Sequence, residues 1–208
     1  MSSSIRVWMY NSDNNSSLTH QEIRTDLNTN LYNVYSYRGE RDTYKRCGRN
    51  CFLIAVHRDP VERFISCYRD RVLNLGRAPR MRLEHFVEQI HEIRSRNKDI
   101  EWHTDLQSSF LKRSSLYDAV IPFHLAAWLL PVVVAQFTGK QSATIPHVRK
   151  SSTLNPQIGI HLRKNIEALY ETDYENGWDG TSLILPGSQT SHREVLKPDI
   201  SSPSPTKF

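Results

Sequence analysis

Arg58 stands between an apolar run and an amphipathic run, and this arrangement favours the binding of an anion. Cys51–Val56 is rich in β-branched and aromatic residues, a composition typical of a short strand buried on both faces. The residues after Pro60 predict a helix, because apolar side chains recur at spacings of three and four: Val61, Phe64, Ile65, Tyr68 and Val72. Asp59 suits the N-cap of that helix, and Pro60 suits its first turn. A strand that delivers an arginine to a helix N-terminus predicts an anion site.

The charge of the chain agrees with an anionic ligand. The formal net charge is +5, and arginines crowd into residues 58–82: Arg58, Arg63, Arg69, Arg71, Arg77, Arg80 and Arg82. Such a patch favours nucleic acid, phosphate esters or sulfated and phosphorylated small molecules, although a solvated basic helix face explains it equally well. Because no motif that reads nucleic acid accompanies the charge, we expect no nucleic-acid partner.

The composition is typical of a soluble globular protein. The 208 residues are enough for one domain with a substantial core, or for one domain with a tail. No apolar run approaches the ~20 residues of a membrane span, and the N-terminal residues lack the apolar core of a signal peptide. We therefore expect a cytoplasmic protein without stable membrane insertion, with association at a membrane surface left open. The cysteines (Cys47, Cys51 and Cys67) form neither a disulfide framework nor a metal-ligand spacing, so we expect reduced thiols and no metal.

After residue 72 the chain alternates predicted helices and strands. The patterns predict a helix over Leu83–Ile93, a mixed segment over Lys98–Ser115 that turns helical at Asp105, a strand over Tyr117–Phe123, and helices over Leu125–Phe137 and Gln157–Tyr174. This alternation predicts an α/β fold with a parallel sheet flanked by helices, whose ligands bind at the carboxyl ends of the strands. From about Gly177 the sequence turns to Gly, Ser, Pro and Thr. We therefore expect one domain over residues 1–176 and a loosely ordered or disordered extension over 177–208.

The segment HRDPVERFISCYRDRV resembles the 3′-phosphate-binding motif of carbohydrate sulfotransferases that use 3′-phosphoadenosine 5′-phosphosulfate (PAPS). That motif reads R-D-P-x-x-R-x-x-S-x-Y, and all six fixed positions agree: Arg58, Asp59, Pro60, Arg63, Ser66 and Tyr68. The resemblance implies that Arg58 and Ser66 hold the 3′-phosphate of the nucleotide. Arg63 and Tyr68 could as easily pack or bridge within the fold.

Three further stretches resemble the same family in the same order, so that the resemblance spans roughly residues 2–178. They are WHTDLQ, LYDAVIPFHLAAWLLPVV, and IPHVRKSSTLN followed by a helix that ends EALYETDYE. The third places Arg149 and Lys150 near the nucleotide. In the second, His124 stands where the family usually has glutamate. The family implies a P-loop-like sulfotransferase fold, PAPS as co-substrate, no metal, and a carbohydrate or glycoconjugate as acceptor.

The N-terminus departs from the family pattern. The family binds the 5′-phosphosulfate with a strand and a loop P-K-x-x-(S/G/C)-(S/T)-(S/T/N), in which backbone N–H groups and hydroxyls surround the anion. Here Ser2, Ser3 and Ser4 resemble the end of that loop, and its lysine and first strand would fall before Met1. We therefore expect a sheet that lacks its first strand. A catalytically inactive, sulfotransferase-like remnant, or an accessory nucleotide- or glycan-binding protein, is the alternative to an active enzyme.

The general base that accepts the proton of the acceptor hydroxyl is sought among histidines and carboxylates. His103 is the first candidate for this catalytic role, because it lies in a stretch that the family shares. The others are His57, His124, His147, Glu22 and Asp105. The sequence leaves open the acceptor sugar and the hydroxyl that is modified.

Overall fold

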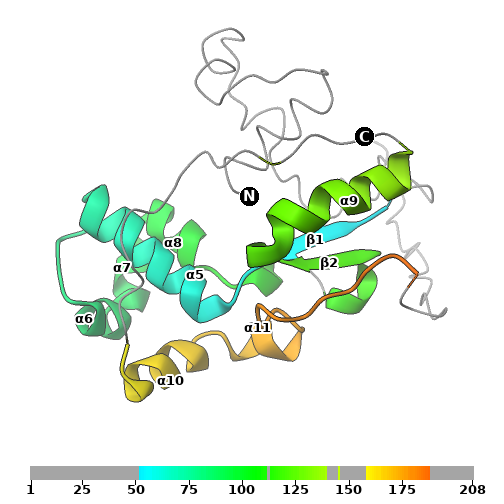
Figure 1. Cartoon of the computed structure of the whole chain (residues 1–208). Coiled ribbons are helices and arrows are strands. Elements are labelled where there is room, and N and C mark those ends of the chain that lie inside the picture. Colours follow the sequence, from blue (N-terminus) through cyan, green and yellow to red (C-terminus); the bar gives the residue numbers. More distant parts are fainter. Residues whose placement is uncertain (1–51, 112, 140–144, 146–157, 188–208) are drawn as a thin grey trace, which may run out of the picture.

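The computed structural model describes residues 52–111, 113–139, 145 and 158–187. Within them, strands β1 (Ile54–His57) and β2 (Ala119–Pro122) form a parallel two-stranded sheet, with His57 opposite Pro122. The predicted parallel pairing is therefore confirmed. Both strands end at the same edge of the sheet, and Arg58 follows directly after β1 at that edge (Figure 1).

Helices lie on two sides of this sheet (Figure 1). The α-helices are α5 (Pro60–Cys67), α6 (Leu83–Glu88), α7 (Ile90–Arg96), α8 (Lys98–Thr104), α9 (Ala126–Thr138), α10 (Ile160–Ala168) and α11 (Glu171–Glu175). The π-helix η2 (Tyr68–Asn74) continues α5, and the short 3₁₀ turns are η3 (Gln107–Ser109), η4 (Ser114–Leu116) and η5 (Phe123–Leu125). Helices α5 to α8 gather beyond the carboxyl edge of the sheet, and α9 packs along the strands.

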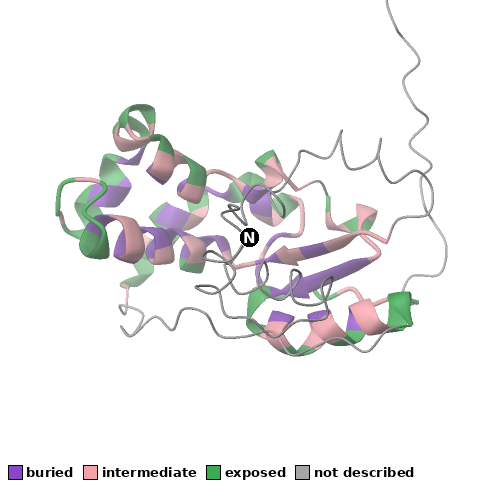
Figure 2. Cartoon of the chain, turned by 90° about the horizontal axis from the view of Figure 1, so that it is seen from above, coloured by how far each residue is buried: buried purple, intermediate pink, exposed green. Residues whose placement is uncertain are grey.

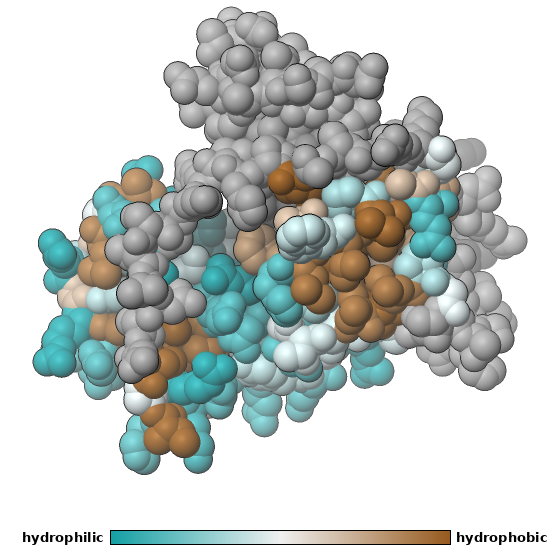
Figure 3. Space-filling model, viewed as in Figure 1, coloured by the Kyte–Doolittle hydropathy of each residue, from teal (hydrophilic) through white to brown (hydrophobic). Residues whose placement is uncertain are grey.

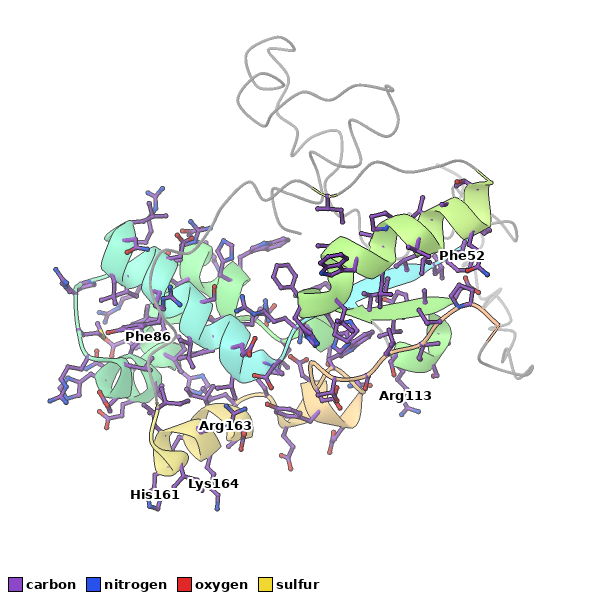
Figure 4. The ribbon with its side chains drawn as sticks, in the orientation of Figure 1. Phe52, Phe86, Arg113, His161, Arg163 and Lys164 are labelled. Atoms are coloured by element: carbon purple, nitrogen blue, oxygen red, sulfur yellow. The ribbon has the colours of Figure 1, made fainter. Side chains whose placement is uncertain are left out.

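The core divides into a helical part and a sheet part. In the helical part, the Phe64 and Phe86 rings lie 5.3 Å apart between α5 and α6, and Figure 4 shows Phe86 among these helices. In the sheet part, alternate residues of β2 face opposite sides, so that Ile121 packs on α9 while Val120 packs on Trp178. Figure 2 shows buried residues along both strands. The sheet is therefore covered on both faces, as its apolar composition predicts.

Three predicted helices have different bounds in the structure. The helix predicted over Leu83–Ile93 is interrupted at Gln89, whose backbone (φ −99°, ψ 7°) leaves the helical region between α6 and α7. The helix predicted to begin at Asp105 is wrong, because α8 ends at Thr104 and Asp105 is extended (φ −64°, ψ 158°). The helix predicted over Gln157–Tyr174 consists of α10 and α11. The buried faces predicted for the first and third of these helices are correct, since apolar spacing reports the face better than the ends.

Residues 177–187, here called the C-terminal strap, differ from the loosely ordered extension that their composition predicts. Trp178 is 0% exposed, and its ring lies 5.4 Å from that of His57 and 5.7 Å from that of Tyr117. Ile184 forms an antiparallel bridge with Val120, with both N–H···O distances at 2.9 Å. The strap, orange in Figure 1, is thus part of the packed domain. Residues 188–208 lie outside the described part of the chain.

Helix α9 carries an apolar surface on its outer side. It lacks charged residues and tolerates Pro131 in its interior. Trp128 is 78% exposed, and Val132, four residues later on the same face, is also exposed. Figure 3 shows hydrophobic residues gathered over this part of the molecule. No helix among the described residues is long and apolar enough to cross a membrane.

Candidate functional site

The junction between β1 and α5 is fixed by Asp59 and Pro60. The Asp59 carboxylate accepts a hydrogen bond from the Glu62 N–H at 2.8 Å, and the Asp59 carbonyl accepts one from the Arg63 N–H at 2.9 Å. Pro60 is the first helical residue and has no N–H to satisfy. The predicted N-cap is therefore confirmed. Because Asp59 already occupies amides of the first turn, an anion at this junction is held by side chains more than by the helix N-terminus.

The Arg58 side chain lies at the carboxyl edge of the sheet. Its Nε is 3.4 Å from Glu62 Oε2, and its guanidinium carbon lies 5.5 Å from the centroid of the Phe123 ring. Phe123 comes directly after β2, so the side chain bridges the ends of both strands. The Arg58 side chain is 28% exposed and Glu62 is more exposed still. A charged, fork-shaped donor is thus available to solvent at this edge.

Ser66 lies on the same face of α5 as Asp59 and Glu62. These residues follow one another at spacings of three and four, which place side chains in one row along a helix. Ser66 is half-buried, and none of the described residues hydrogen-bonds its hydroxyl. The structure therefore brings Arg58 and Ser66 to one face, with Glu62 between them.

Gln107 holds the backbone of Arg58. Its Oε1 accepts a hydrogen bond from the Arg58 N–H at 3.1 Å, and its Nε2 donates to the Arg58 carbonyl at 2.8 Å. Gln107 is itself fixed by Asp173, whose carboxylate accepts from the Gln107 N–H at 2.9 Å, the Ser108 N–H at 2.8 Å and the Ser108 hydroxyl at 2.6 Å. Both Gln107 and Asp173 are buried. Neither residue is among the predicted site residues, although both lie in stretches that resemble the sulfotransferase family.

His57 is buried beneath the C-terminal strap. Its Nε2 donates a hydrogen bond to the Ser182 carbonyl at 2.8 Å, which places the proton of the neutral ring on that nitrogen. Burial lowers the pKa of His57 below the ordinary histidine value. The ring is therefore neutral and covered, and it does not offer a base to an acceptor.

Arg63 and Tyr68 act within the fold. The Arg63 guanidinium donates to the Asp105 carbonyl and lies 5.3 Å from the centroid of the Phe110 ring. The Tyr68 hydroxyl donates to the Met81 carbonyl at 2.7 Å. These two motif positions therefore fasten α5 and η2 to neighbouring segments.

His103 lies away from Arg58, near the other end of the α5–η2 helix. The Arg71 guanidinium donates to His103 Nε2, and Asp99 Oδ1 lies 3.6 Å from the same nitrogen. Arg71 follows Pro60 by eleven residues, or about 16 Å at the rise of an α-helix. The basic nitrogen of His103 is thus engaged, and the structure does not bring it together with Arg58 and Ser66. The catalytic assignment of His103 stays a prediction that this geometry does not support.

Protonation of His103 should lower the free energy of unfolding at acidic pH. Burial and the nearby Arg71 lower the pKa of His103 from 6.5 to about 4. As the pH falls, His103 is therefore protonated in the unfolded chain before it is protonated in the folded chain. The free energy of unfolding is highest above pH 6.5 and decreases as the pH falls from 6.5 towards 4. Urea unfolding between pH 7.5 and 4.5 should show a smaller pH dependence in His103→Gln than in the wild type. Equal pH dependence in the two proteins would contradict this prediction.

The comparison with known proteins decides the family. A model of the sulfotransferase family matches residues 1–176 of the 208. The chain belongs to the sulfotransferase family. No curated protein and no solved structure matches it. Sulfuryl transfer is therefore the general activity of this sulfotransferase, and the helices and parallel strands of its described residues agree with the α/β, P-loop-like fold of the family.

The other predicted site residues of this sulfotransferase are paired with another residue, lie beside the junction, or are not described. Asp105 pairs with Arg94 at 3.1 Å, whereas His124 is exposed in η5, beside Phe123. Burial raises the pKa of the Cys67 thiol to about 12, which makes it unreactive. Several predictions lie outside the described residues: those for Ser2, Ser3, Ser4, Glu22, Cys47, Cys51, His147, Arg149 and Lys150.

Basic residues on α10 do not join the site. Figure 4 shows His161 and Lys164 pointing away from the rest of the molecule, and Arg163 is paired with Glu167 at 3.0 Å. Within the described ranges, no cluster of His, Cys, Asp and Glu could hold a metal ion. Among the described residues, the positive charge at the junction comes from Arg58.

Proposed function

We propose that this sulfotransferase transfers a sulfuryl group from PAPS to a hydroxyl of a carbohydrate or glycoconjugate. In this proposal, Arg58 and Ser66 hold the 3′-phosphate of the donor. The observation that carries it is the placement of the Arg58 guanidinium at the carboxyl edge of a parallel sheet, where it pairs with Glu62, and of the Ser66 hydroxyl one turn further along the same face of α5 as Glu62. These residues belong to a motif that agrees at all six positions with the 3′-phosphate motif of PAPS-dependent enzymes.

The chemistry of the two side chains suits a phosphate group. A guanidinium donates two parallel hydrogen bonds to a phosphate, and such charge-assisted bonds are roughly twice as strong as neutral ones. The ion pair between Arg58 and Glu62 is solvent-exposed, so its contribution is only ~0–1 kcal/mol and it yields readily to a dianion. The Ser66 hydroxyl has no hydrogen bond to any described residue and can turn towards the same phosphate.

Arg58 and Ser66 bind the donor in this proposal and do not touch the reacting atoms. PAPS supplies the sulfuryl group and a nucleotide bisphosphate as leaving group. Transfer of this kind resembles phosphoryl transfer, in which rigid positioning in line with the acceptor hydroxyl lowers the barrier. On the family resemblance, the 5′ side of the donor falls to Ser2, Ser3 and Ser4, and the flank of the nucleotide to Arg149 and Lys150.

Calorimetric titration with 3′,5′-adenosine bisphosphate tests the proposed site. We expect binding to the wild type and a loss of about 100-fold in affinity in Arg58→Ala, because two charge-assisted hydrogen bonds disappear. Arg82→Ala is the matched control, since it removes an arginine of the same basic region that is 83% exposed, and its affinity should be unchanged. Absence of binding to the wild type, or equal losses in both variants, would overturn the site. Sulfation of a glycan by labelled PAPS then separates a transferase from a binding protein.

A further inference from the structure

We infer that Gln107 is a positioning residue, which sets the direction of the Arg58 side chain by clamping the Arg58 backbone. This inference rests on the proposed function, because Arg58 is taken there as the 3′-phosphate ligand. The clamp uses both polar ends of one side-chain amide: Oε1 on the Arg58 N–H and Nε2 on the Arg58 carbonyl. Gln107 is 3% exposed, so it acts on the ligand only through Arg58.

The clamp stands where the β-ladder ends. Pairing of β1 with β2 stops at His57 and Pro122, and Arg58 is the first residue beyond it. Backbone N–H and carbonyl groups that are left buried without partners cost free energy, so a residue leaving a sheet needs new ones. Gln107 supplies both and thereby continues the pattern of a strand for one more residue. The next residue, Asp59, is held in turn as the N-cap of α5 by its hydrogen bond from the Glu62 N–H.

The direction of a long side chain depends on the backbone angles that this clamp fixes. The guanidinium lies several bonds from its Cα, so a modest rotation of the Arg58 backbone moves it by more than an ångström. Misplacement of a binding group by about 1 Å can cost two orders of magnitude in rate. Gln107 therefore contributes to donor binding without contacting the donor.

Asp173, in α11, holds the backbone of Gln107 in place. It accepts three hydrogen bonds, from the Gln107 N–H, the Ser108 N–H and the Ser108 hydroxyl, and it is 0% exposed. Asp173 lies in α11, more than one hundred residues after Arg58 in the sequence. The position of the phosphate ligand thus depends on a contact chain that runs from α11 through η3 to the end of β1.

Titration of two Gln107 variants with 3′,5′-adenosine bisphosphate tests this inference. Gln107→Met keeps the length of the side chain but removes both hydrogen bonds. In Gln107→Glu the ionised carboxylate accepts from the Arg58 N–H but cannot donate to its carbonyl, whereas the protonated carboxyl does both. At pH 8 we expect affinity about tenfold below the wild type in each variant.

Lowering the pH distinguishes positioning from a merely structural role. Burial raises the pKa of a carboxyl group, so the Gln107→Glu variant should regain its proton and return to within about threefold of the wild type near pH 5.5. Gln107→Met should not recover. Affinity is taken relative to the wild type at each pH, which cancels titration of the phosphate itself, and circular dichroism establishes that each variant is folded.

Each outcome bears on a separate claim. Variants that bind as the wild type does at pH 8, or a recovery shared by Gln107→Met, would overturn the positioning role while leaving the proposed function in place. A wild-type chain that fails to bind the nucleotide would overturn the proposed function, and this inference with it. If Gln107→Met does not fold, the pH response of the size-conserving Gln107→Glu alone decides the matter.

Discussion

Replacing Asp173 with alanine should lower the free energy of unfolding by about 4 kcal/mol. The carboxylate is buried and accepts hydrogen bonds from the Gln107 N–H, the Ser108 N–H and the Ser108 hydroxyl. Bonds to a charged group contribute about 1.5–3 kcal/mol each, and their loss leaves buried donors without partners. Urea unfolding measures this change directly. Nucleotide affinity should fall as well, because Gln107 loses its anchor.

Glu175→Ala is the matched control for this substitution. Glu175 is an exposed carboxylate in the same short helix, α11, so its removal should change the free energy of unfolding by less than about 0.5 kcal/mol. If Asp173→Ala and Glu175→Ala lowered stability equally, the buried hydrogen bonds of Asp173 would not be the source of its effect.

Replacing Gly180 with alanine should destabilise the protein by about 3 kcal/mol, which combines backbone strain with overpacking. Gly180 has a φ of +84°, a conformation that residues with a Cβ adopt at a cost. A Cβ at this position would lie 2.5 Å from the backbone nitrogen of Asp59 and 2.7 Å from its Cα. Neither the strap nor the N-cap can move freely, because Trp178 and the start of α5 are both packed. The added methyl group should therefore strain the contact between the C-terminal strap and Asp59.

The chain provides a control for the strain alone. Gly187 has nearly the same φ, +82°, but no atom of the described residues lies within 4 Å of the position that its Cβ would take. Gly187→Ala should therefore cost only about 1 kcal/mol, the penalty for the backbone conformation. Thermal and urea unfolding of the two variants separates strain from steric contact, and equal losses would contradict a close approach of Gly180 to Asp59.

The β1–α5 junction could be predicted from sequence because its determinants are local. A β-branched run, an aspartate N-cap and a proline in the first turn all lie within a few residues of Arg58, and the structure has each of them where the pattern places it. The parallel pairing with β2 followed from the alternation of strands and helices. The resemblance of the motif to sulfotransferases agrees with the family match.

The hydrogen bonds that hold the junction in place could not be predicted in the same way, because they join residues far apart in the sequence. Gln107 reaches Arg58 across 49 residues, and Asp173 reaches Gln107 across 66. No periodicity reports such contacts. The helix α8 was missed for a different reason: Asn97 accepts from the Asp99 and Ile100 N–H groups as an N-cap, a local signal that was present in the sequence but not used.

The strap was missed because composition averages over a segment. Residues 177–208 taken together are mostly polar residues, glycine and proline, so Trp178 and the run 183–185 raise the apparent hydrophobicity of the whole segment very little. Trp178 and Ile184 nevertheless pack against one face of the sheet. Large buried aromatic side chains stabilise a fold by several kcal/mol each. A few apolar residues can therefore decide whether a mostly polar segment is part of a core.

The strap also separates two boundaries that are usually taken as one. The region that this chain shares with its family ends at residue 176, whereas the layer that closes the sheet begins with Trp178 two residues later. A shortened gene product designed on the shared region would expose Ala55 and Val120 to water and leave His57 without its Ser182 partner. The region that matches the family is thus shorter than the packed domain, and a protein made for expression should keep residues 177–187.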